Sequence, residues 1–460
     1  MSTSPALQTI RHRLSQVTPI QWLIVAAVFH VVFTLGIFMI GHFRLWPSVF
    51  DEHGIGVGFA VDGAVYRWWI PKISNLLWHR GFSAWFALPV PLHCRLYSLV
   101  FIFPGSLVGH NILAAEPLNL LYYLAILVFV YLVAKELFDS CTGLIAAGIV
   151  AVWPSLLIHT TQLVRDSLSI ALMFALFWIL VTILQRKLTW RYALVTGFAG
   201  VVIVIIFWLT RGNFWNIVFA TVLLSLLLLI IRMARERKIL VSNFLILAAV
   251  FTAVLIVPTR INSTIIGGAK PPTAVIAIPD GTNEQSKSVW SRLVTQIRSR
   301  RAGFAIYGAQ ASNVDNEVKF NDASDIVRYL PRALAVGMFA PFPRMWFESG
   351  KSGLAGRLLA GAEMLVMYLL YGLAIVCLWR ERKKLAVWLV TLVTLTGFVA
   401  LGLVVINAGA LFRLRYVFWI LVIVLASETI KRVLKLGPDR SPLEQFKLGR
   451  GQSGATTTCN

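Results

Sequence analysis

The chain has 460 residues, of which 58% are hydrophobic and only 13% are charged, and this composition excludes a soluble globular protein. Lysine and arginine number 42 against 20 aspartates and glutamates, which gives a net charge of +22. In a soluble chain such an excess would indicate nucleic-acid binding, but here the basic residues stand between apolar runs that are long enough to cross about 30 Å of hydrocarbon. The sequence therefore predicts an all-α polytopic membrane protein that binds membrane lipid and no nucleic acid.

About ten apolar runs are long enough to be membrane-spanning helices. The first run is not followed by a small-residue cleavage site, so we expect it to be a retained span rather than a signal peptide. The predicted spans lie near residues 20–40, 117–134, 142–158, 167–184, 192–209, 214–231, 239–257, 358–378, 385–406 and 412–430.

These spans divide the chain into five parts. A short N-terminal segment at 1–19 precedes a transmembrane module at 20–257, which contains a long first loop at 41–116. A second long loop at 258–357 separates this module from the C-terminal helices at 358–430, and a tail at 431–460 follows. No internal repeat of 20 to 50 residues is visible, which mildly disfavours a transporter built from inverted repeats.

The orientation of the spans follows from the basic residues in the short segments. If the N-terminus is cytoplasmic, the inner segments hold 20 lysines and arginines. The short outer segments hold four, namely Arg165, Arg211, Arg413 and Arg415. The positive-inside rule then predicts cytoplasmic termini and places both long loops outside a cell (inner) membrane.

Each long loop has stretches expected at the membrane surface. Residues 95–108 are apolar but too short to span, so we expect a re-entrant or interfacial helix there. The tryptophan-rich segment 66–86 before it suits the headgroup level. In the second loop we expect a basic helix around Trp290 to Arg301 and an interfacial segment near 329–347.

The acids Asp51, Glu52, Asp62 and Asp166 all belong to predicted outer segments. Asp62 and Tyr66 stand four residues apart, so on a helix they share a face. Asp166 either caps the helix of the fourth span or faces a site, and spacing does not decide between these roles. Glu363 is an ionisable group within the eighth span and therefore faces a cavity, a partner or the outer interface.

No dedicated metal site is indicated. Asp51, Glu52 and His53 are potential ligands, but adjacent residues rarely converge on one ion. The four cysteines have no paired spacing that would suggest a zinc site or a disulfide framework. We expect His159, which stands beside a predicted outer turn, to be a hydrogen-bonded polar residue at the membrane interface.

Arginines of the predicted outer side are candidates for binding a phosphate. The planar fork of a guanidinium matches phosphate oxygens, and Arg211, Arg413 and Arg415 all enter or leave spans on that side. Residues two apart on a helix diverge by about 200°, so we expect only one of Arg413 and Arg415 to bind phosphate. The other is expected at headgroups or the outer loop.

The order of several motifs resembles the GT-C superfamily of membrane glycosyltransferases, particularly the bacterial relatives of protein O-mannosyltransferases and the aminoarabinose transferase of lipid A. The motifs are DGAVY at 62–66, LPVPLHCRLYSLVFIFPG at 88–105, GHNILAAEPLNLLYY at 109–123 and VAKELFD at 133–139. The second acid of the family corresponds to Asp166, and its late R-x-R motif corresponds to Arg413 and Arg415. The family's first acid is usually followed by Glu, but Gly63 follows Asp62, so Asp51 and Asp62 both remain candidates for the catalytic base.

The resemblance implies a sugar donor on polyprenyl phosphate and transfer with inversion on the extracytoplasmic face. Under it, Asp62, Asp166 and Asp51 are the candidate catalytic residues, whereas Tyr66, Arg413, Arg415, Arg211 and Glu52 are the candidate substrate-binding residues. One carboxylate suffices as general base because a phosphate leaving group needs little protonation. The departing phosphate needs cationic groups or a divalent ion, and no cofactor is otherwise implied.

Other functions remain open at this point. The acceptor is a lipid, a glycan or a protein, and the sequence does not say which. An O-antigen-type polymerase or ligase would share the many spans and outward arginines but lack the DxxxY segment. A lipid-linked sugar transporter or flippase would need charged or broken helices near the bilayer midplane.

Overall fold

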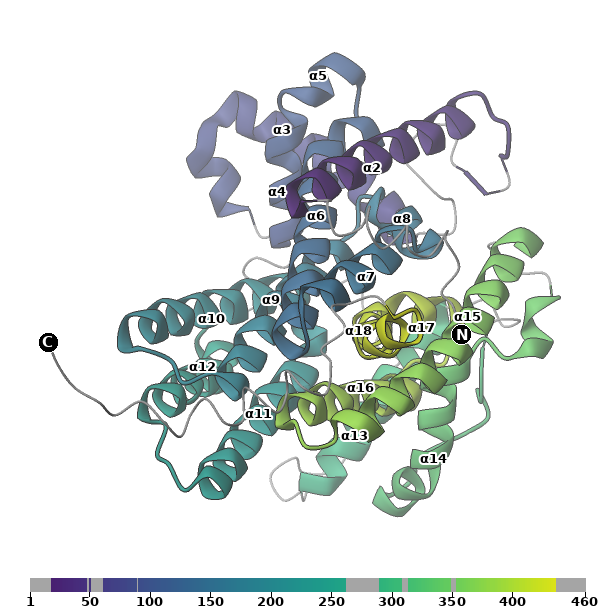
Figure 1. Ribbon diagram of the computed structural model, residues 1–460. Helices are drawn as coiled ribbons and strands as arrows, with labels where there is room; N and C mark the ends of the chain where they lie inside the picture. The colour runs from purple at the N-terminus through teal and green to yellow at the C-terminus, as the bar shows by residue number, and fades with distance from the viewer. Residues whose placement is uncertain are drawn as a thin grey trace, which may run out of the picture.

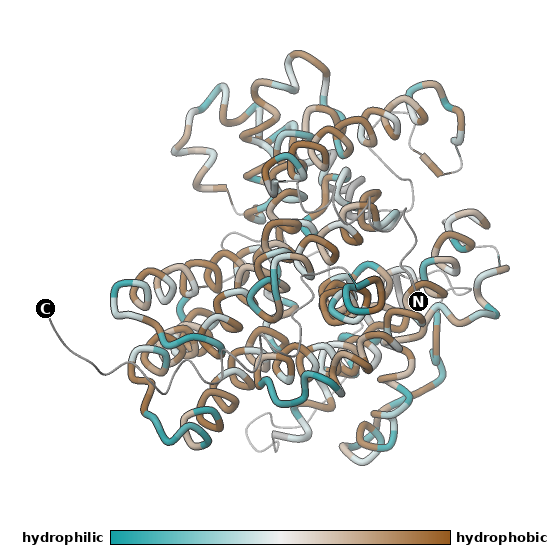
Figure 2. The backbone as a smooth tube through the Cα atoms, in the orientation of Figure 1, coloured by the Kyte–Doolittle hydropathy of each residue, from teal (hydrophilic) through white to brown (hydrophobic). Residues whose placement is uncertain are grey.

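The computed structural model describes residues 18–47, 49–50, 61–88, 90–261, 289–307, 313–348 and 353–435. Nearly all of this part of the chain is helical (Figure 1). Asn313 and Asn407 form an isolated antiparallel β-bridge. Apolar residues run along most of the helices, and hydrophilic residues gather at their ends and turns (Figure 2). The predicted all-α polytopic membrane fold is confirmed.

Every predicted span corresponds to a helix or a bent helix pair. In chain order these are α2 (Pro19–His42), α6 (Ile112–Leu137), α7 (Ser140–Ala151) with α8 (Pro154–Thr160), α9 (Asp166–Gln185), α10 (Trp190–Arg211), α11 (Trp215–Glu236), α12 (Val241–Arg260), α15 (Gly353–Glu381), α16 (Leu385–Val404), and α17 (Ala408–Leu414) with α18 (Tyr416–Val433).

Length and composition alone identify seven apolar stretches in the described part, or nine if each bent pair is one span. One of the seven, Trp190–Glu236, contains both α10 and α11. Leu188 N–H, before α10, donates to Asn243 Oδ1 near the start of α12 (3.1 Å), and Trp208 Nε1 donates to Ile261 O beyond its end (2.7 Å). Helices α10 and α12 therefore run in parallel, so α11 between them runs the opposite way. Counting α10 and α11 separately gives the ten spans that the sequence predicts.

Helix α9 lies at the centre of the bundle, and 89% of the residues in its most apolar stretch are buried. It packs against α6, α10, α11, α16 and α18, and Figure 1 shows it between the upper and lower groups of helices. Helix α2, by contrast, is only 22% buried and lies at the edge. The central position of α9 brings its first residue, Asp166, into contact with the ends of several other helices.

The first long loop forms short helices rather than an additional span. These are α3 (Val61–Ala87), α4 (Leu92–Phe101) and α5 (Pro104–Val108), and they lie with α2 in the upper part of Figure 1. Helix α3 is broken at Gly81, whose φ of 77° suits a residue without Cβ. Exposed aromatic side chains, including Trp68 and Trp78, remain on α3. The expected short helix within 95–108 is present as α4 and α5, and its position relative to lipid remains a prediction.

The described part of the second long loop packs onto the bundle. It contains α13 (Val289–Tyr307), which is the expected basic helix, then α14 (Ala323–Phe339) and the short 3₁₀ helix η4 (Pro343–Trp346). Helix α14 lies directly against α16, where a Cβ added at Gly402 would approach Ala333 O to 1.9 Å. The two glycines Gly337 and Gly402 thus allow an unusually close helix contact.

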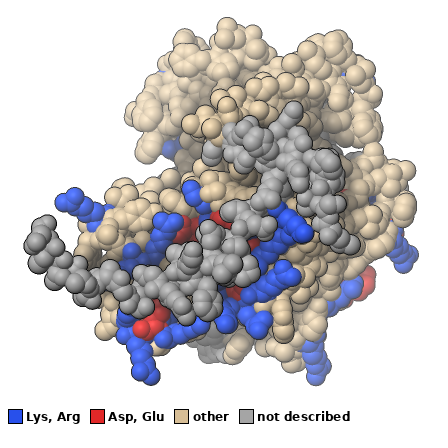
Figure 3. All heavy atoms as spheres, viewed as in Figure 1, with Lys and Arg blue, Asp and Glu red and all other residues tan. Residues whose placement is uncertain are grey.

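Residues of the predicted inner segments meet at one end of the bundle. Glu428 forms ion pairs with Lys431 and Arg432 (both 2.6 Å), and Lys384 pairs with Glu381 (3.1 Å). Basic and acidic side chains gather on the lower part of the face in Figure 3, whereas the upper part is largely uncharged. The predicted outer residues meet at the opposite ends of the same helices, as an alternating topology requires.

Candidate functional site

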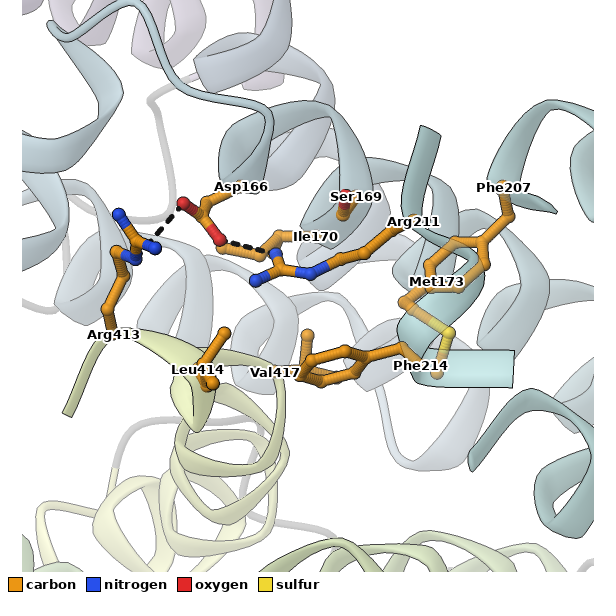
Figure 4. A pocket seen from close by; sticks show the side chains of 10 residues that line it. All are labelled: Asp166, Ser169, Ile170, Met173, Phe207, Arg211, Phe214, Arg413, Leu414 and Val417. Atoms are coloured by element: carbon orange, nitrogen blue, oxygen red, sulfur yellow. Dashed lines mark hydrogen bonds and ion pairs between the residues drawn. The ribbon is translucent and has the colours of Figure 1, made fainter. Parts of the chain in front are cut away.

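Asp166, Arg211 and Arg413 come together although they are far apart in the sequence (Figure 4). Asp166 is the first residue of α9 and is 2% exposed. The guanidinium of Arg211, the last residue of α10, donates from Nη1 to Asp166 Oδ1. Arg413 on α17 places its Nε 3.4 Å from Asp166 Oδ2. Arg165 precedes α9 and its side chain makes no capping hydrogen bond, while Asp166 is the acid of the first turn and pairs with the two arginines.

Arg165 adds a third cation to this group and interacts electrostatically with Asp166. We call Arg165, Asp166, Arg211 and Arg413 the Asp166 cluster. Three guanidinium groups face one carboxylate, so the cluster has a net charge of about +2 at neutral pH because arginine stays protonated. Asp166 and Arg211 are buried, whereas Arg165 and Arg413 are partly exposed. A surplus of positive charge at a partly buried site is costly unless an anion neutralises it. The cluster therefore has the charge of an anion-binding site.

The cluster lies beside a pocket whose remaining walls are mostly apolar (Figure 4). The centre of the Phe214 ring lies 4.5 Å from the Arg211 guanidinium carbon. Beyond the charged groups the lining side chains are Ser169, Ile170, Met173, Phe207, Phe214, Leu414 and Val417. The pocket is small, and it joins a cationic end to apolar walls.

Side chains from two neighbouring helices hold the turn that leads into Asp166. Tyr97 on α4 donates to Asn119 Oδ1 on α6 (2.7 Å), and Asn119 Nδ2 donates to Thr161 O (3.0 Å). Tyr97 and Asn119 are both fully buried. Because a broken hydrogen bond inside an apolar bundle is costly, these bonds fix the backbone just before Arg165 and Asp166.

A second buried network ties the same turn to α2. His30 contacts Glu116 Oε1 through Nδ1 (2.8 Å) and Thr160 Oγ1 through Nε2 (3.1 Å). Thr34 donates to the other oxygen of Glu116 (2.8 Å). Helix α2, although peripheral, thereby helps to position the end of α8.

Helices α3 and α4 bring Tyr66 and His93 together near the cluster. The rings of Tyr66 and His93 meet edge to face, with centroids 4.5 Å apart. Burial, together with the positive charge of Arg165, lowers the pKa of His93 to about 3, so the imidazole is neutral. Asp62 lies one turn before Tyr66 on α3, while Asp51 and Glu52 lie outside the described residues.

The two arginines of the R-x-R motif point to different places, as their spacing predicts. Arg413 faces Asp166, whereas Arg415 is fully buried on the other side. Its Nη1 donates to Gly337 O (3.3 Å), and its guanidinium carbon lies 4.0 Å from the Trp419 ring centroid. Arg415 thus contacts the second long loop, and Arg413 is the phosphate-binding candidate.

Glu363 has a partner within the bundle. Its carboxylate accepts hydrogen bonds from Ser155 N–H (2.7 Å) and Oγ (2.6 Å), and from Trp153 Nε1 (3.0 Å). These donors lie at the 70° bend between α7 and α8. His159 bonds to Ser155 O (2.7 Å) and contacts Tyr416 Oη (3.0 Å), which agrees with its expected place as a satisfied polar residue.

Two residues of this region have no sequence signal that marks them as site residues. Arg165 stands in the sequence only as one basic residue of a short outer segment, and His93 stands in the motif at 88–105 without any spacing that sets it apart. The proximity of His93 to the cluster depends on how α4 packs, which local sequence does not encode. Within the described ranges no group of three or more His, Cys, Asp or Glu residues could hold a metal ion.

No family model and no curated protein matches the sequence. Among solved structures, the chain is similar to the archaeal oligosaccharyltransferase AglB from Archaeoglobus fulgidus in complex with an inhibitory peptide and a dolichol-phosphate, with 14% identity and a TM-score of 0.47. The match covers 95% of this chain but only 53% of AglB, so the chain spans about half of that protein's length.

Proposed function

We propose that the protein is a membrane glycosyltransferase that transfers a sugar from a polyprenyl-phosphate donor to an acceptor on the extracytoplasmic face of the cell (inner) membrane. The observation that carries this proposal is the Asp166 cluster, a partly buried and net cationic group beside a pocket whose other walls are mostly apolar. A polyprenyl phosphate supplies an anion and a long apolar chain together. A soluble sugar nucleotide would supply the anion without a reason for the apolar walls.

Arg211 and Arg413 bind the donor phosphate in this proposal. Their guanidinium groups come from α10 and α17 and converge on the carboxylate of Asp166. Asp166 orients both side chains before the donor arrives, so the fixed positive charge is already in place when the phosphate departs. This role explains why an acid stands in a site that binds an anion.

Asp62 is the proposed general base. It removes the proton from the acceptor hydroxyl, whose oxygen forms a bond to the anomeric carbon while the bond from that carbon to the phosphate oxygen breaks. The bonding electrons leave with the polyprenyl phosphate, and direct displacement inverts the anomeric configuration. Support for Asp62 comes from its place on α3, one turn before Tyr66, whose ring contacts His93.

A purified transfer assay tests the proposal. Polyprenyl monophosphate sugars are offered as donors, and polyprenyl diphosphate oligosaccharides are offered in parallel. Transfer from the monophosphate donor alone supports the proposal, whereas use of the diphosphate donor indicates a polymerase or ligase. Mass spectrometry of the surface glycans from cells with and without the protein then identifies the sugar and the class of acceptor.

A further inference from the structure

His93 belongs to the small set of buried polar groups that lack a partner in the described part of the chain. It is 1% exposed, and its Nδ1 has no hydrogen-bond partner. Its other ring nitrogen lies 3.5 Å from Cys94 Sγ, which is a weak hydrogen-bonding group. Buried polar atoms are nearly always paired, so an unpaired one needs an explanation.

The position of His93 relates it to the Asp166 cluster rather than to the hydrophobic core. One turn further along α4, Tyr97 Oη lies 3.4 Å from Val164 O, the carbonyl just before Arg165. The charges that act on the His93 ring are those of Arg165, Asp166 and Arg211. Within the same cluster, Arg165 Nε also lacks a hydrogen-bond partner. Two buried polar atoms on different elements are thus left unsatisfied around one carboxylate, which is the pattern expected where a ligand supplies the missing bonds.

The first turn of α4 adds backbone donors beside the ring. His93 is the second residue of this ten-residue helix, and the residue before the helix, Pro91, provides no side-chain capping hydrogen bond. The N–H groups at the start of a helix have no partner within it. A ligand group at His93 therefore meets both an imidazole nitrogen and the positive end of a helix.

The chemistry of the ring distinguishes between the parts of the donor. The imidazole is neutral, so one nitrogen donates and the other accepts. If Nδ1 is the acceptor, a phosphate oxygen cannot bond to it, whereas a hydroxyl can donate to it or accept from it. A sugar hydroxyl therefore satisfies Nδ1 in either tautomer, and the arginines are better suited to the phosphate.

We propose that His93 hydrogen-bonds a hydroxyl of the transferred sugar and so determines which sugar is accepted. This inference rests on the proposed function. The sugar then lies between the phosphate-binding arginines and α3, with Tyr66 beside the imidazole. This location is also where an acceptor hydroxyl would have to approach the anomeric carbon.

Binding measurements with and without the sugar test this proposal. The full-length protein is titrated with undecaprenyl phosphate and with undecaprenyl phosphates carrying glucose, mannose or arabinose, one at a time. The two variants are His93→Ala, which removes Nδ1, and His93→Asn, which retains a polar atom near the same place. His110→Ala is the matched control, since His110 is exposed and stacks on Phe101 with centroids 5.6 Å apart.

We expect His93→Ala to bind undecaprenyl phosphate like the wild type and to bind the preferred sugar-carrying lipid about three- to tenfold more weakly, the loss of one neutral hydrogen bond. His93→Asn should recover part of that loss. An equal loss for the sugar-free lipid, or no loss for either lipid, overturns the proposal for His93. A wild-type protein that binds neither undecaprenyl phosphate nor any of its sugar-carrying forms overturns the proposed function itself.

Discussion

At the scale of single residues, Asp62 and Asp166 are two acids with different proposed tasks. Asp166 forms ion pairs with Arg211 and Arg413, so each of its oxygens lies beside a cation. Asp62 lies on α3, one turn before Tyr66. A carboxylate that pairs with two arginines is poorly suited to removing a proton from an acceptor hydroxyl, so we assign that task to Asp62.

We therefore expect Asp62→Asn to lower transfer by about 10²- to 10⁴-fold, because the amide keeps the size of the side chain and loses its basicity. Membrane insertion should be unchanged, and single-turnover transfer by the purified variant measures the effect. Asp51→Asn is the control. If Asp51→Asn loses activity while Asp62→Asn keeps wild-type turnover, the base is Asp51.

The pair Arg413 and Arg415 separates phosphate binding from packing. Arg413→Lys should reduce transfer about tenfold or more, because a point charge cannot replace a planar fork that contacts Asp166 and phosphate together. The melting temperature of the Arg413→Lys variant should change little, since Arg413 lines the pocket rather than the packed core.

Arg415→Lys should show the opposite result. The guanidinium of Arg415 is buried against Trp419 and Gly337, so the variant should melt at a lower temperature while the folded fraction still binds donor. Thermal unfolding and donor titration of both variants in the same detergent give the comparison. Equal loss of donor binding in the two variants would contradict this division of roles.

At the scale of elements, the contact between α14 and α16 depends on glycine. A Cβ at Gly402 would lie 1.9 Å from Ala333 O, which belongs to a backbone that cannot rotate away. Gly402→Ala should therefore destabilise the protein by about 1–3 kcal/mol, the usual cost of overpacking. Gly372→Ala in α15 is the matched control, because nothing lies within 4 Å of the Cβ built there.

The packing of α14 also has an acid-sensitive element. Arg332 donates to Asp315 from Nε (2.8 Å), and Tyr329 Oη donates to the same oxygen (2.7 Å). The hydrogen bond from Arg332 contributes most to holding the pKa of Asp315 below its usual value. A depressed acid pKa stabilises the fold above the unfolded pKa of about 3.9, and this contribution is lost as pH falls through the folded value.

We accordingly expect limited proteolysis within residues 289–348 to be constant from pH 8 to pH 5 and to increase only below about pH 4. Two proteases, one active in acid and one active at neutral pH, are compared at a pH where both work. This comparison separates the effect of pH on the protein from the effect of pH on the protease. Asp315→Asn should be cleaved faster at pH 7 and should show a smaller acid response. A wild-type transition near pH 6 would indicate a histidine instead.

Particular elements show how much the sequence could predict. Long apolar runs predicted every span because the hydrocarbon thickness sets a minimum length. The bend between α7 and α8 was missed, although Pro154 marks the start of α8, because the run 142–158 is apolar throughout. The spacing of Arg413 and Arg415 predicted that they would diverge, but the face that each occupies depends on the packing of α17.

The candidate site was predictable only in part for the same reason. Asp166, Arg211 and Arg413 share a predicted outer side, which charge patterning revealed. Their convergence, and the approach of His93, come from contacts between α4, α9, α10 and α17. Such long-range contacts leave no trace in the spacing of residues along one helix.

At the scale of the whole molecule, the topology makes a direct prediction about accessibility. Two cysteine-substituted variants test this prediction. Glu317→Cys changes an exposed residue of the second long loop, and Lys238→Cys changes an exposed residue of the turn after α11. An impermeant thiol reagent added to intact cells should label the first and spare the second, because the positive-inside rule places the turn in the cytoplasm. The unsubstituted chain is the control for native cysteines. The reverse pattern would move the Asp166 cluster to the cytoplasmic face.

The bond between Glu363 and Ser155 has a consequence for the order in which the chain enters the membrane. Ser155 precedes Glu363 by 208 residues, so at a synthesis rate of about 5–20 residues per second the bend of α7 and α8 is made roughly 10–40 s earlier. Placing an unpaired acid in the middle of a span costs about 2.5–3.5 kcal/mol on insertion scales. When α15 enters the bilayer, the hydrogen-bond donors of Trp153 and Ser155 are therefore already present for the carboxylate of Glu363. A circular permutant that is translated from α15 onward would have to insert Glu363 before those donors exist.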